Sequence, residues 1–350
     1  MARLFYSETQ KVYTENTKKK KSYSSVFFRE IRTVIILNPI QMRLYNKYKV
    51  IFLSLTMSYN FAIAQTGPGG AGNIGNNQIW LDAHSLNYTD GSPVAIWGDL
   101  SGNGSNFTQD VSSKRPVFST SGIKGVPSLV FDGVNDIMES SSIAALESSN
   151  ITYFIVYDRT TTSSDMLITS SYTSNIKKWR TYMNNGQNTI LSAHYSPTIK
   201  WVRFTDPPGP SFFSTHITPT QHQTFNQGDL EMSKTVAYTV PSGHNNVFIG
   251  NRNPLTVSGY TFTGEISEVI VFNSALTDLE RIMVENYLGA KYNMAIPVDH
   301  YAFEATHSFG LIGLANDGVN IQNEAQGSGV LELSGAAGLD FGDYYLVAHT

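Results

Sequence analysis

The segment WGDLSGNGSNF, residues 97–107, has the residue spacing of a cation-binding loop. Asp99, Ser101 and Asn103 alternate and a glycine follows, as in calcium loops of the D-x-[DN]-x-[DN]-G type. The twelfth position is Asp110 instead of a bidentate glutamate, and only one carboxylate stands among the first five positions. A tight turn whose Asx side chains cap the local backbone would use the same residues. Two interpretations therefore stay open, a turn or a partial Ca²⁺ site completed from a distant strand.

Aromatic and cationic side chains concentrate between residues 179 and 212. Sugar rings stack their C–H faces on aromatic side chains, and polar neighbours then fix the orientation of the sugar. The same aromatic residues could instead belong to the core of a sheet. The candidate ligand-binding residues are Trp179, Arg180, Tyr182, Tyr195 and Trp201.

Motifs for catalysis are missing from the sequence. There is no E-x-D-x-E pattern to place two carboxylates on one face of a strand, no G-x-S-x-G and no H-E-x-x-H. Glu265 and Glu268 are three residues apart and would point to opposite faces of a regular strand. His216, His222 and His244 are expected in loops. We predict no catalytic residue and expect a protein without enzymatic activity.

Composition favours an extracellular, β-rich protein over a helical enzyme of the cytosol. Of the 350 residues, 41% are hydrophobic and 15% charged, which allows one or two domains with a real core. The absence of cysteine excludes disulfides and zinc–thiolate sites. The first 50 residues hold 11 of the 24 basic and 3 of the 28 acidic residues, so the remainder is strongly acidic. An acidic body argues against nucleic acid as a partner.

A secretory signal peptide is expected at residues 42–64. Basic residues precede a short apolar run, which ends in an A-x-A site with cleavage after Ala64. The run is too short and too interrupted for a membrane span, and a buried helix is the alternative. Met42 is the expected start, with 1–41 a mis-annotated upstream segment. The mature protein is then secreted or held at the cell surface.

After a Gly-rich leader at 65–77, the pattern indicates an antiparallel sandwich or jelly roll. Short apolar runs rich in β-branched and aromatic residues alternate with Gly, Asn, Asp and Pro. The expected strands include residues 128–131, 151–157, 246–250 and 266–272, with a turn at 131–136. Residues 277–293 are expected to form one helix, which begins at a Thr277–Glu280 capping box and closes the domain. Residues 297–350 read as a second, β-rich and truncated domain.

Several motifs in order resemble the LamG-like, concanavalin A-like jelly-roll domains of secreted Bacteroidetes (Flavobacteria-type) proteins. They are QIWLDA (78–83), VAIWGDLSGNG (94–104), RPVF (115–118), GVPSLVFDGVND (125–136), FNQG (225–228) and GEISEVIVFNSALTDLERIMVENYLGAKYNM (264–294). The resemblance covers roughly 65–296, and GPGG at 67–70 is also typical of these proteins. The tail, 299–350, resembles the start of a domain of unknown function that often follows.

The resemblance implies an all-β, two-sheet concanavalin A-like sandwich over 78–296, with one C-terminal capping helix. It also implies glycan binding or adhesion, often with calcium. Related domains commonly carry Asp where this chain has Ser267, and Glu268 could replace it as the distant metal ligand. Alternatively, Glu268 is an exposed strand carboxylate. Trp80 and Trp97 are expected in the core.

Together these features predict a secreted, non-catalytic module that binds carbohydrate or mediates adhesion. Its partner would be a glycan or cell-surface polysaccharide, with no role for nucleic acid and no membrane span in the mature chain. Two alternatives remain: a glycoside hydrolase or lyase of the same superfold, and a ligand-free spacer in a surface adhesin.

Overall fold

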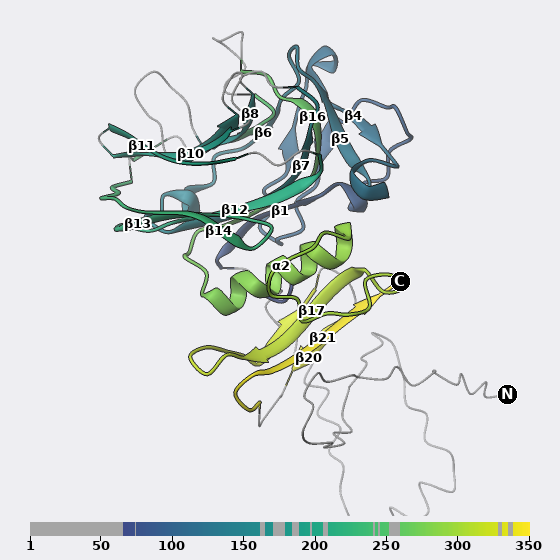
Figure 1. Cartoon of the computed structure of the whole chain (residues 1–350). Coiled ribbons are helices and arrows are strands. Elements are labelled where there is room, and N and C mark those ends of the chain that lie inside the picture. Colours follow the sequence, from purple (N-terminus) through teal and green to yellow (C-terminus); the bar gives the residue numbers. More distant parts are fainter. Residues whose placement is uncertain are drawn as a thin grey trace, which may run out of the picture.

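The computed structural model describes residues 66–350 except 74, 162–164, 171–178, 184–188, 197, 206–208, 241, 244–245, 252–259, 328–330 and 335–338. The side chains of residues 195–201 also lie outside this description. Two large antiparallel sheets pack face to face, and helix α2 (Asp278–Tyr292) lies between this sandwich and a smaller sheet (Figure 1). The all-β sandwich with one C-terminal helix is therefore confirmed.

The first sheet has the order β14-β13-β12-β7-β16-β5-β4, and β1 also pairs with β16. Strand β16 is long enough for its first half to pair with β5 and its second half with β1. The strands are β1 (Asn77–Asp82), β4 (Val117–Ser119), β5 (Ser128–Asp132), β7 (Ile151–Arg159), β12 (Ser211–Ile217), β13 (Gln221–Asn226), β14 (Asp229–Thr235) and β16 (Thr263–Phe272).

The second sheet has the order β11-β10-β9-β8-β15-β6-β3-β2, again with antiparallel pairing. Its strands are β2 (Ile96–Trp97), β3 (Phe107–Thr108), β6 (Met138–Ser140), β8 (Met166–Ser170), β9 (Trp179–Met183), β10 (Thr189–Ser196), β11 (Thr198–Thr205) and β15 (Val247–Ile249). Short 3₁₀ turns lie at Ala83–Ser85, Ser112–Lys114, Ile123–Gly125 and Ala144–Leu146.

The central strand β7 is buried on both faces, which explains its continuous apolar run. Its residues alternate between two cores. Tyr153 and Ile155 pack in the core between the two sheets, whereas Phe154 and Val156 pack in a second core beneath α2. The first sheet is therefore the middle layer of the molecule, with the second sheet on one side and α2 on the other.

Helix α2 begins at the expected capping box. The Thr277 hydroxyl accepts from the Glu280 amide at 3.2 Å, and the Glu280 carboxylate accepts from the Thr277 amide at 2.8 Å. Nearly all of the helix is buried, because it is covered on its far side as well: Leu279 and Met283 contact the smaller sheet. Among the described residues no helix has the length and apolar character to span a membrane.

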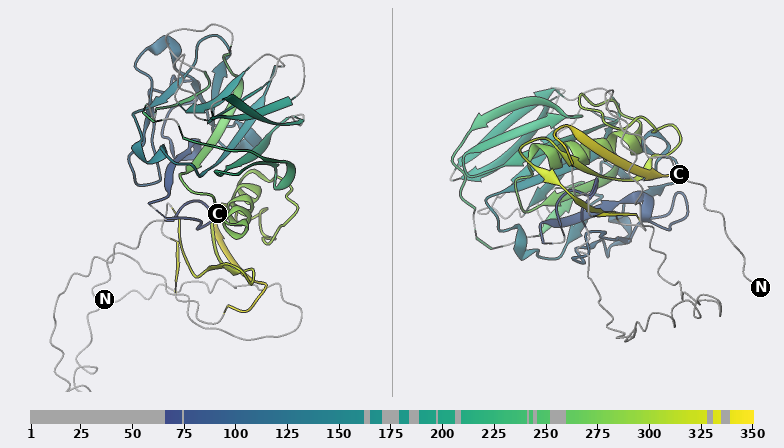
Figure 2. Two further views of the ribbon diagram at one scale, coloured as in Figure 1. Left: turned by 90° about the vertical axis from the view of Figure 1, so that its left-hand side faces the viewer. Right: turned by 90° about the horizontal axis from the view of Figure 1, so that it is seen from below.

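The smaller sheet, with the order β18-β17-β21, covers α2, and a β19-β20 hairpin packs on its outer side. Seen from below, its yellow strands cross the green helix (Figure 2). The strands are β17 (Phe309–Asn316), β18 (Ile321–Gln322), β19 (Glu324–Gln326), β20 (Glu332–Ser334) and β21 (Asp343–His349).

The Gly-rich leader runs between α2 and the smaller sheet. Gly69 forms a parallel bridge to Ile312, and the Thr66 hydroxyl donates to the Gln326 carbonyl at 2.6 Å. A Cβ atom on Gly69 would collide with the Met283 carbonyl, and one on Gly70 would collide with the Ala325 side chain. Glycine is needed here because the backbone passes too close to its neighbours for any side chain.

Candidate functional site

The outer face of the second sheet, turned away from the first sheet, carries two of the candidate binding residues. Strand β9 alternates strictly: Arg180 and Tyr182 are half-buried, and the other three residues are buried. Tyr182 pairs with Leu191, which pairs in turn with Arg203. Residues in one cross-strand row share a face of the sheet, so the exposed Arg203 lies on the same side as Tyr182.

These side chains form what we call the outer-face cluster: Arg180, Tyr182, Arg203 and Tyr260. The Arg180 guanidinium carbon lies 5.4 Å from the centre of the Tyr182 ring, and Tyr260 meets that ring edge-on at 6.3 Å. Burial raises the pKa of the Tyr182 hydroxyl, although Arg180 and Arg203 act to lower it. The hydroxyl therefore stays protonated at neutral pH.

Trp201 and Tyr195 are only partly placed. Ala193 pairs with Arg180 on one side and with Trp201 on the other, so Trp201 lies in the cross-strand row of Arg180. Tyr195 pairs with Ile199. The side chains of both residues lie outside the described part of the chain.

Trp179 is buried in the core, which is the alternative that the sequence left open for these aromatic residues. It is 1% exposed, and its ring stacks on Tyr153 at 4.9 Å between the two sheets. One step along a strand reverses the direction of the side chain, so Trp179 points inward where Arg180 points outward. Trp80 and Trp97 are buried, as predicted.

The 97–107 segment forms a turn that the Asp99 carboxylate holds together through hydrogen bonds. One carboxylate oxygen accepts from the amides of Trp80 and Ser101, and the other accepts from the Ser101 hydroxyl and the Ser105 amide, at 2.7–3.0 Å. Asn103 donates to the Asn77 carbonyl at 2.7 Å and ties the turn to β1. This is the capping arrangement of the turn interpretation. Among the described residues no three His, Asp or Glu side chains are grouped to hold a metal.

A β-bulge in β16 changes the directions of the two glutamates. Ile266 pairs with Tyr157 and Glu268 with Val156, so Ser267 is the extra residue. The hydroxyl of Ser267 contacts that of Tyr292 on α2, and Glu268 also faces the helix. The expectation that Glu265 and Glu268 point to opposite faces assumed a regular strand, and the bulge between them removes that basis. Glu265 accepts a hydrogen bond from the Ser128 hydroxyl at 2.7 Å, and Glu268 takes part in a separate network.

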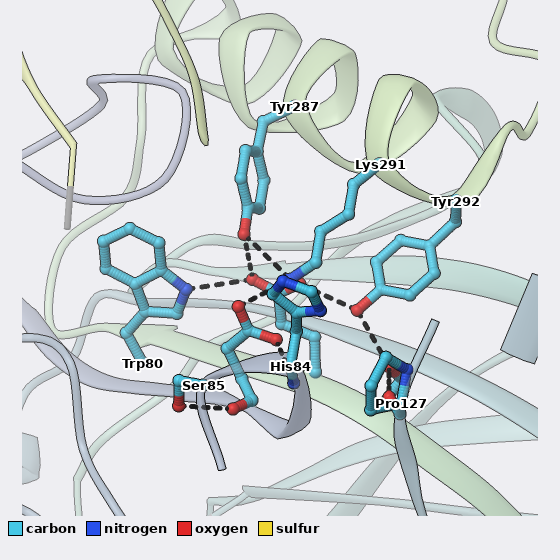
Figure 3. A network of polar contacts seen from close by, with 10 residues as sticks. Trp80, His84, Ser85, Pro127, Tyr287, Lys291 and Tyr292 are labelled. Carbon is cyan, nitrogen blue, oxygen red and sulfur yellow. Dashed lines mark hydrogen bonds and ion pairs between the residues drawn. The ribbon is translucent and has the colours of Figure 1, made fainter. Parts of the chain in front are cut away.

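Glu268 is buried beneath α2 and is not an exposed strand carboxylate. Its four donors are Trp80, Tyr287, Lys291 and Tyr292, which are labelled in Figure 3. One of its oxygens accepts from the Trp80 indole at 2.9 Å and the Tyr287 hydroxyl at 2.8 Å. The other accepts from Lys291 at 2.7 Å and the Tyr292 hydroxyl at 2.9 Å. It is fully engaged by these donors and takes part in a different network from Asp99.

Lys291 completes this group, which we call the Lys291 network: Trp80, Asp82, Glu268, Tyr287, Lys291 and Tyr292. The Lys291 ammonium lies 2.7 Å from a carboxylate oxygen of Asp82 and 2.7 Å from one of Glu268. The three side chains are 1%, 11% and 0% exposed. Lys291 and Asp82 are not among the candidate site residues expected from sequence. The signal that could have found them is a lysine on a helix face expected to be apolar.

Burial and charge oppose each other in the Lys291 network. Burial raises the pKa of Glu268, against the attraction of Lys291. Burial lowers the pKa of Lys291, but Asp82 and Glu268 outweigh it and the net shift is upward. Two carboxylates share one buried ammonium, so the three side chains together carry excess negative charge when both carboxylates are ionised.

Two histidines expected in loops are buried in strands. His222 on β13 lies between the sheets, where its ring is 2.9 Å from a nitrogen of His194 and 3.0 Å from the Ser192 hydroxyl. His216 on β12 packs against Phe225 at 5.3 Å. His244 lies outside the described residues. The sequence did not reveal this because polar residues in β12 and β13 resemble those of a loop.

No protein-family model matches the chain, and the search of curated proteins gives no match. Solved structures with a similar fold include a Trypanosoma rangeli sialidase in complex with 2,3-difluorosialic acid (TM-score 0.43, 12% identity, covering 60% of this chain and 32% of that one). They include the binding domain of Paraclostridial Mosquitocidal Protein 1 (0.46, 13%, 61% and 53%). They also include domain 4 of AbnA, a GH43 extracellular arabinanase from Geobacillus stearothermophilus, in complex with arabinotriose (0.42, 16%, 60% and 97%).

The chain thus spans about a third of the sialidase and about half of the toxin binding domain. Similarities at this level do not identify a ligand. The strand pairing of the chain itself defines its class, an antiparallel β-sandwich with a helix and a small second sheet.

Proposed function

We propose that this chain is a non-catalytic carbohydrate-binding module, secreted or held at the cell surface, whose ligand contacts the outer-face cluster. The observation that carries this proposal is the position of Arg180 against the ring of Tyr182, on the side of the second sheet that does not pack in the core. Aromatic surface and guanidinium donors together suit a sugar ring, which has apolar C–H faces and hydroxyl acceptors at its edge.

The competing functions have weaker support. A hydrolase of this superfold would need a pair of carboxylates facing substrate. Here Glu265 is bonded to Ser128, and Glu268 is bonded to four donors beneath the helix. A ligand-free spacer would give no reason for two arginines and two tyrosines to gather on one face.

The test is binding of the purified chain to a panel of neutral and acidic polysaccharides. Tyr182→Ala and Arg180→Ala should each weaken binding to the recognised glycan about tenfold, the loss of one stacking or cation–π contact. Tyr88→Ala is the matched control, because Tyr88 is also a half-buried tyrosine but packs on Phe118 away from the cluster. Absence of binding to every polysaccharide would contradict the proposal and favour the spacer.

The same assay repeated in EDTA tests the calcium expectation. Both oxygens of Asp99 already accept hydrogen bonds from the turn, so we expect EDTA to leave binding unchanged. Loss of binding in EDTA, restored by Ca²⁺ and abolished by Asp99→Ala, would instead place Asp99 in a metal-dependent sugar site.

A further inference from the structure

The Lys291 network brings an amine and two carboxylates together inside the protein, and neither of the functions above uses it. Lys291 on α2, Asp82 at the end of β1 and Glu268 on β16 are far apart in sequence, and the fold places them within hydrogen-bond distance. A buried ion pair of this kind contributes little to stability after desolvation, so a structural role alone explains it poorly.

We propose that Lys291 and Asp82 form an intramolecular isopeptide bond, with Glu268 as the proton-transfer group. The reaction joins Nζ of Lys291 to Cγ of Asp82 and breaks one C–O bond of the carboxylate. The ammonium loses two protons and the carboxylate loses one oxygen, which leave together as water. The charges cancel within the pair, and the reaction needs no oxidant, cofactor or second protein. This proposal is independent of the proposed function.

The geometry of Asp82 suits attack by the amine. One carboxylate oxygen is 2.7 Å from Nζ, and the other accepts from the His84 amide at 2.9 Å. That amide would stabilise the negative charge that develops on this oxygen as the tetrahedral intermediate forms. Holding the two groups in contact replaces a bimolecular encounter with an intramolecular step, which accelerates amide formation strongly.

Glu268 has the position and the environment of a proton-transfer group. Its oxygen lies 2.7 Å from Nζ, so it can take a proton from the ammonium and pass it to the departing oxygen. Burial raises the pKa of Glu268, which makes its carboxylate a stronger base than one in water. Trp80, Tyr287 and Tyr292 hold it in place through three further hydrogen bonds.

The surroundings favour condensation over hydrolysis. Lys291 and Glu268 are 1% and 0% exposed, which keeps bulk water from the new amide. Asp82 is slightly more open, at 11%, and lies next to the exposed His84, which leaves a short route by which the released water can depart.

Mass spectrometry of the purified, denatured full chain tests the proposal directly. The bond lowers the intact mass by about 18 Da, the mass of one water. Trypsin gives a second readout, because an amidated lysine is not cleaved. Free Lys291 releases the peptide 282–291, whereas linked Lys291 leaves 282–350 joined to the peptide that ends at Lys114.

Three variants identify the groups involved. Glu268→Gln should give the unreduced mass and release peptide 282–291, whereas Glu265→Gln, the matched control on the same strand, should remain linked. Asp82→Asn should react with loss of ammonia and reach the same final mass as linked wild type. A wild-type chain at its sequence mass, with peptide 282–291 released, would overturn the proposal even if every variant failed to fold. A bond that persists in Glu268→Gln would overturn the role of Glu268.

Discussion

At the scale of single residues, His216 is a buried base whose Nε2 atom has no hydrogen-bond partner among the described residues. It lies on the face of β12 that turns toward α2, and its ring packs on Phe225. The Arg281 guanidinium carbon lies 4.2 Å from the centre of the same Phe225 ring. Burial and the nearby Arg281 charge lower the pKa of His216 to about 3. The folded protein therefore holds this imidazole neutral over the range in which an exposed histidine would become charged.

This predicts a loss of stability in acid. Between about pH 6.5 and 3 the unfolded chain binds a proton at His216 that the folded chain does not. The free energy of unfolding then falls as the pH falls, by up to about 1.4 kcal/mol per pH unit. Glu285 and Asp136 act in the opposite direction, because their pKa values are raised to about 7 and about 6.

Urea unfolding at several pH values can isolate the histidine contribution. His216→Phe should lose stability less steeply than wild type from about pH 6 to 4. His349→Phe makes the same change at an exposed position and should follow the wild-type curve. Parallel curves for wild type and His216→Phe would show that His216 is not the group that titrates.

The sequence indicates a segment rich in aromatic and cationic groups at residues 179–182, but not which of its side chains face outward. In the structure Trp179 points inward and Tyr182 outward. Alternation fixes that neighbours face opposite ways, yet it cannot say which of two aromatic residues faces the core. The bulge at Ser267 has no sequence signature either, so the direction of Glu268 could not be predicted.

At the scale of elements, the leader shows how a glycine can be required by its surroundings. Gly69 and Gly104 have nearly the same positive φ, 70° and 71°. A Cβ at Gly104 would meet nothing within 4 Å, whereas one at Gly69 would collide with the Met283 carbonyl of α2.

Alanine substitutions at Gly104 and Gly69 separate the energetic cost of a positive φ from the cost of a steric collision. Gly104→Ala should lower the free energy of unfolding by about 1 kcal/mol, the cost of a positive φ for alanine. Gly69→Ala should cost about 2–4 kcal/mol, because the leader must also move away from α2. Equal losses, measured by urea unfolding, would mean that the contact between leader and helix is not tight.

The sequence predicts where helix α2 begins and ends, but not which of its charged residues are buried. The capping box at Thr277 and Glu280 is a local signal, and the structure confirms it. The pattern suggested one apolar face, but Glu285 and Lys291 are also buried. Glu285 pairs with Arg281 one helical turn earlier, which is a local spacing. The partners of Lys291 lie on distant strands, and local periodicity carries no information about them.

At the scale of the whole molecule, the two domains expected on either side of residue 297 both pack on helix α2. α2 contributes Tyr287 and Leu288 to the core over the first sheet, and Leu279 and Met283 to the contact with β17 and β21. The sandwich and the smaller sheet therefore share this helix.

A chain ending at residue 296 should be less stable than the full chain. Exposing Leu279 and Met283 would cost about 1.5–3 kcal/mol for each side chain. We expect a lower melting temperature and binding of a hydrophobic dye, and Met283→Ala in the full chain should reproduce part of the loss. An unchanged melting temperature would show that the sandwich is independent of residues 297–350.

The bridge between Gly69 and Ile312 also determines how the protein would respond to force. Ile312 pairs on its other side with Val347, so the leader and β21 flank the same strand. The leader runs parallel to β17 and β21 runs antiparallel to it, so residues 66 and 350 leave from the same end of that strand. Tension applied between them would peel the small sheet apart bond by bond, while the sandwich stays outside the line of force. The small sheet would then unfold at a lower force than the sandwich, so it would give way before the proposed sugar-binding face is strained.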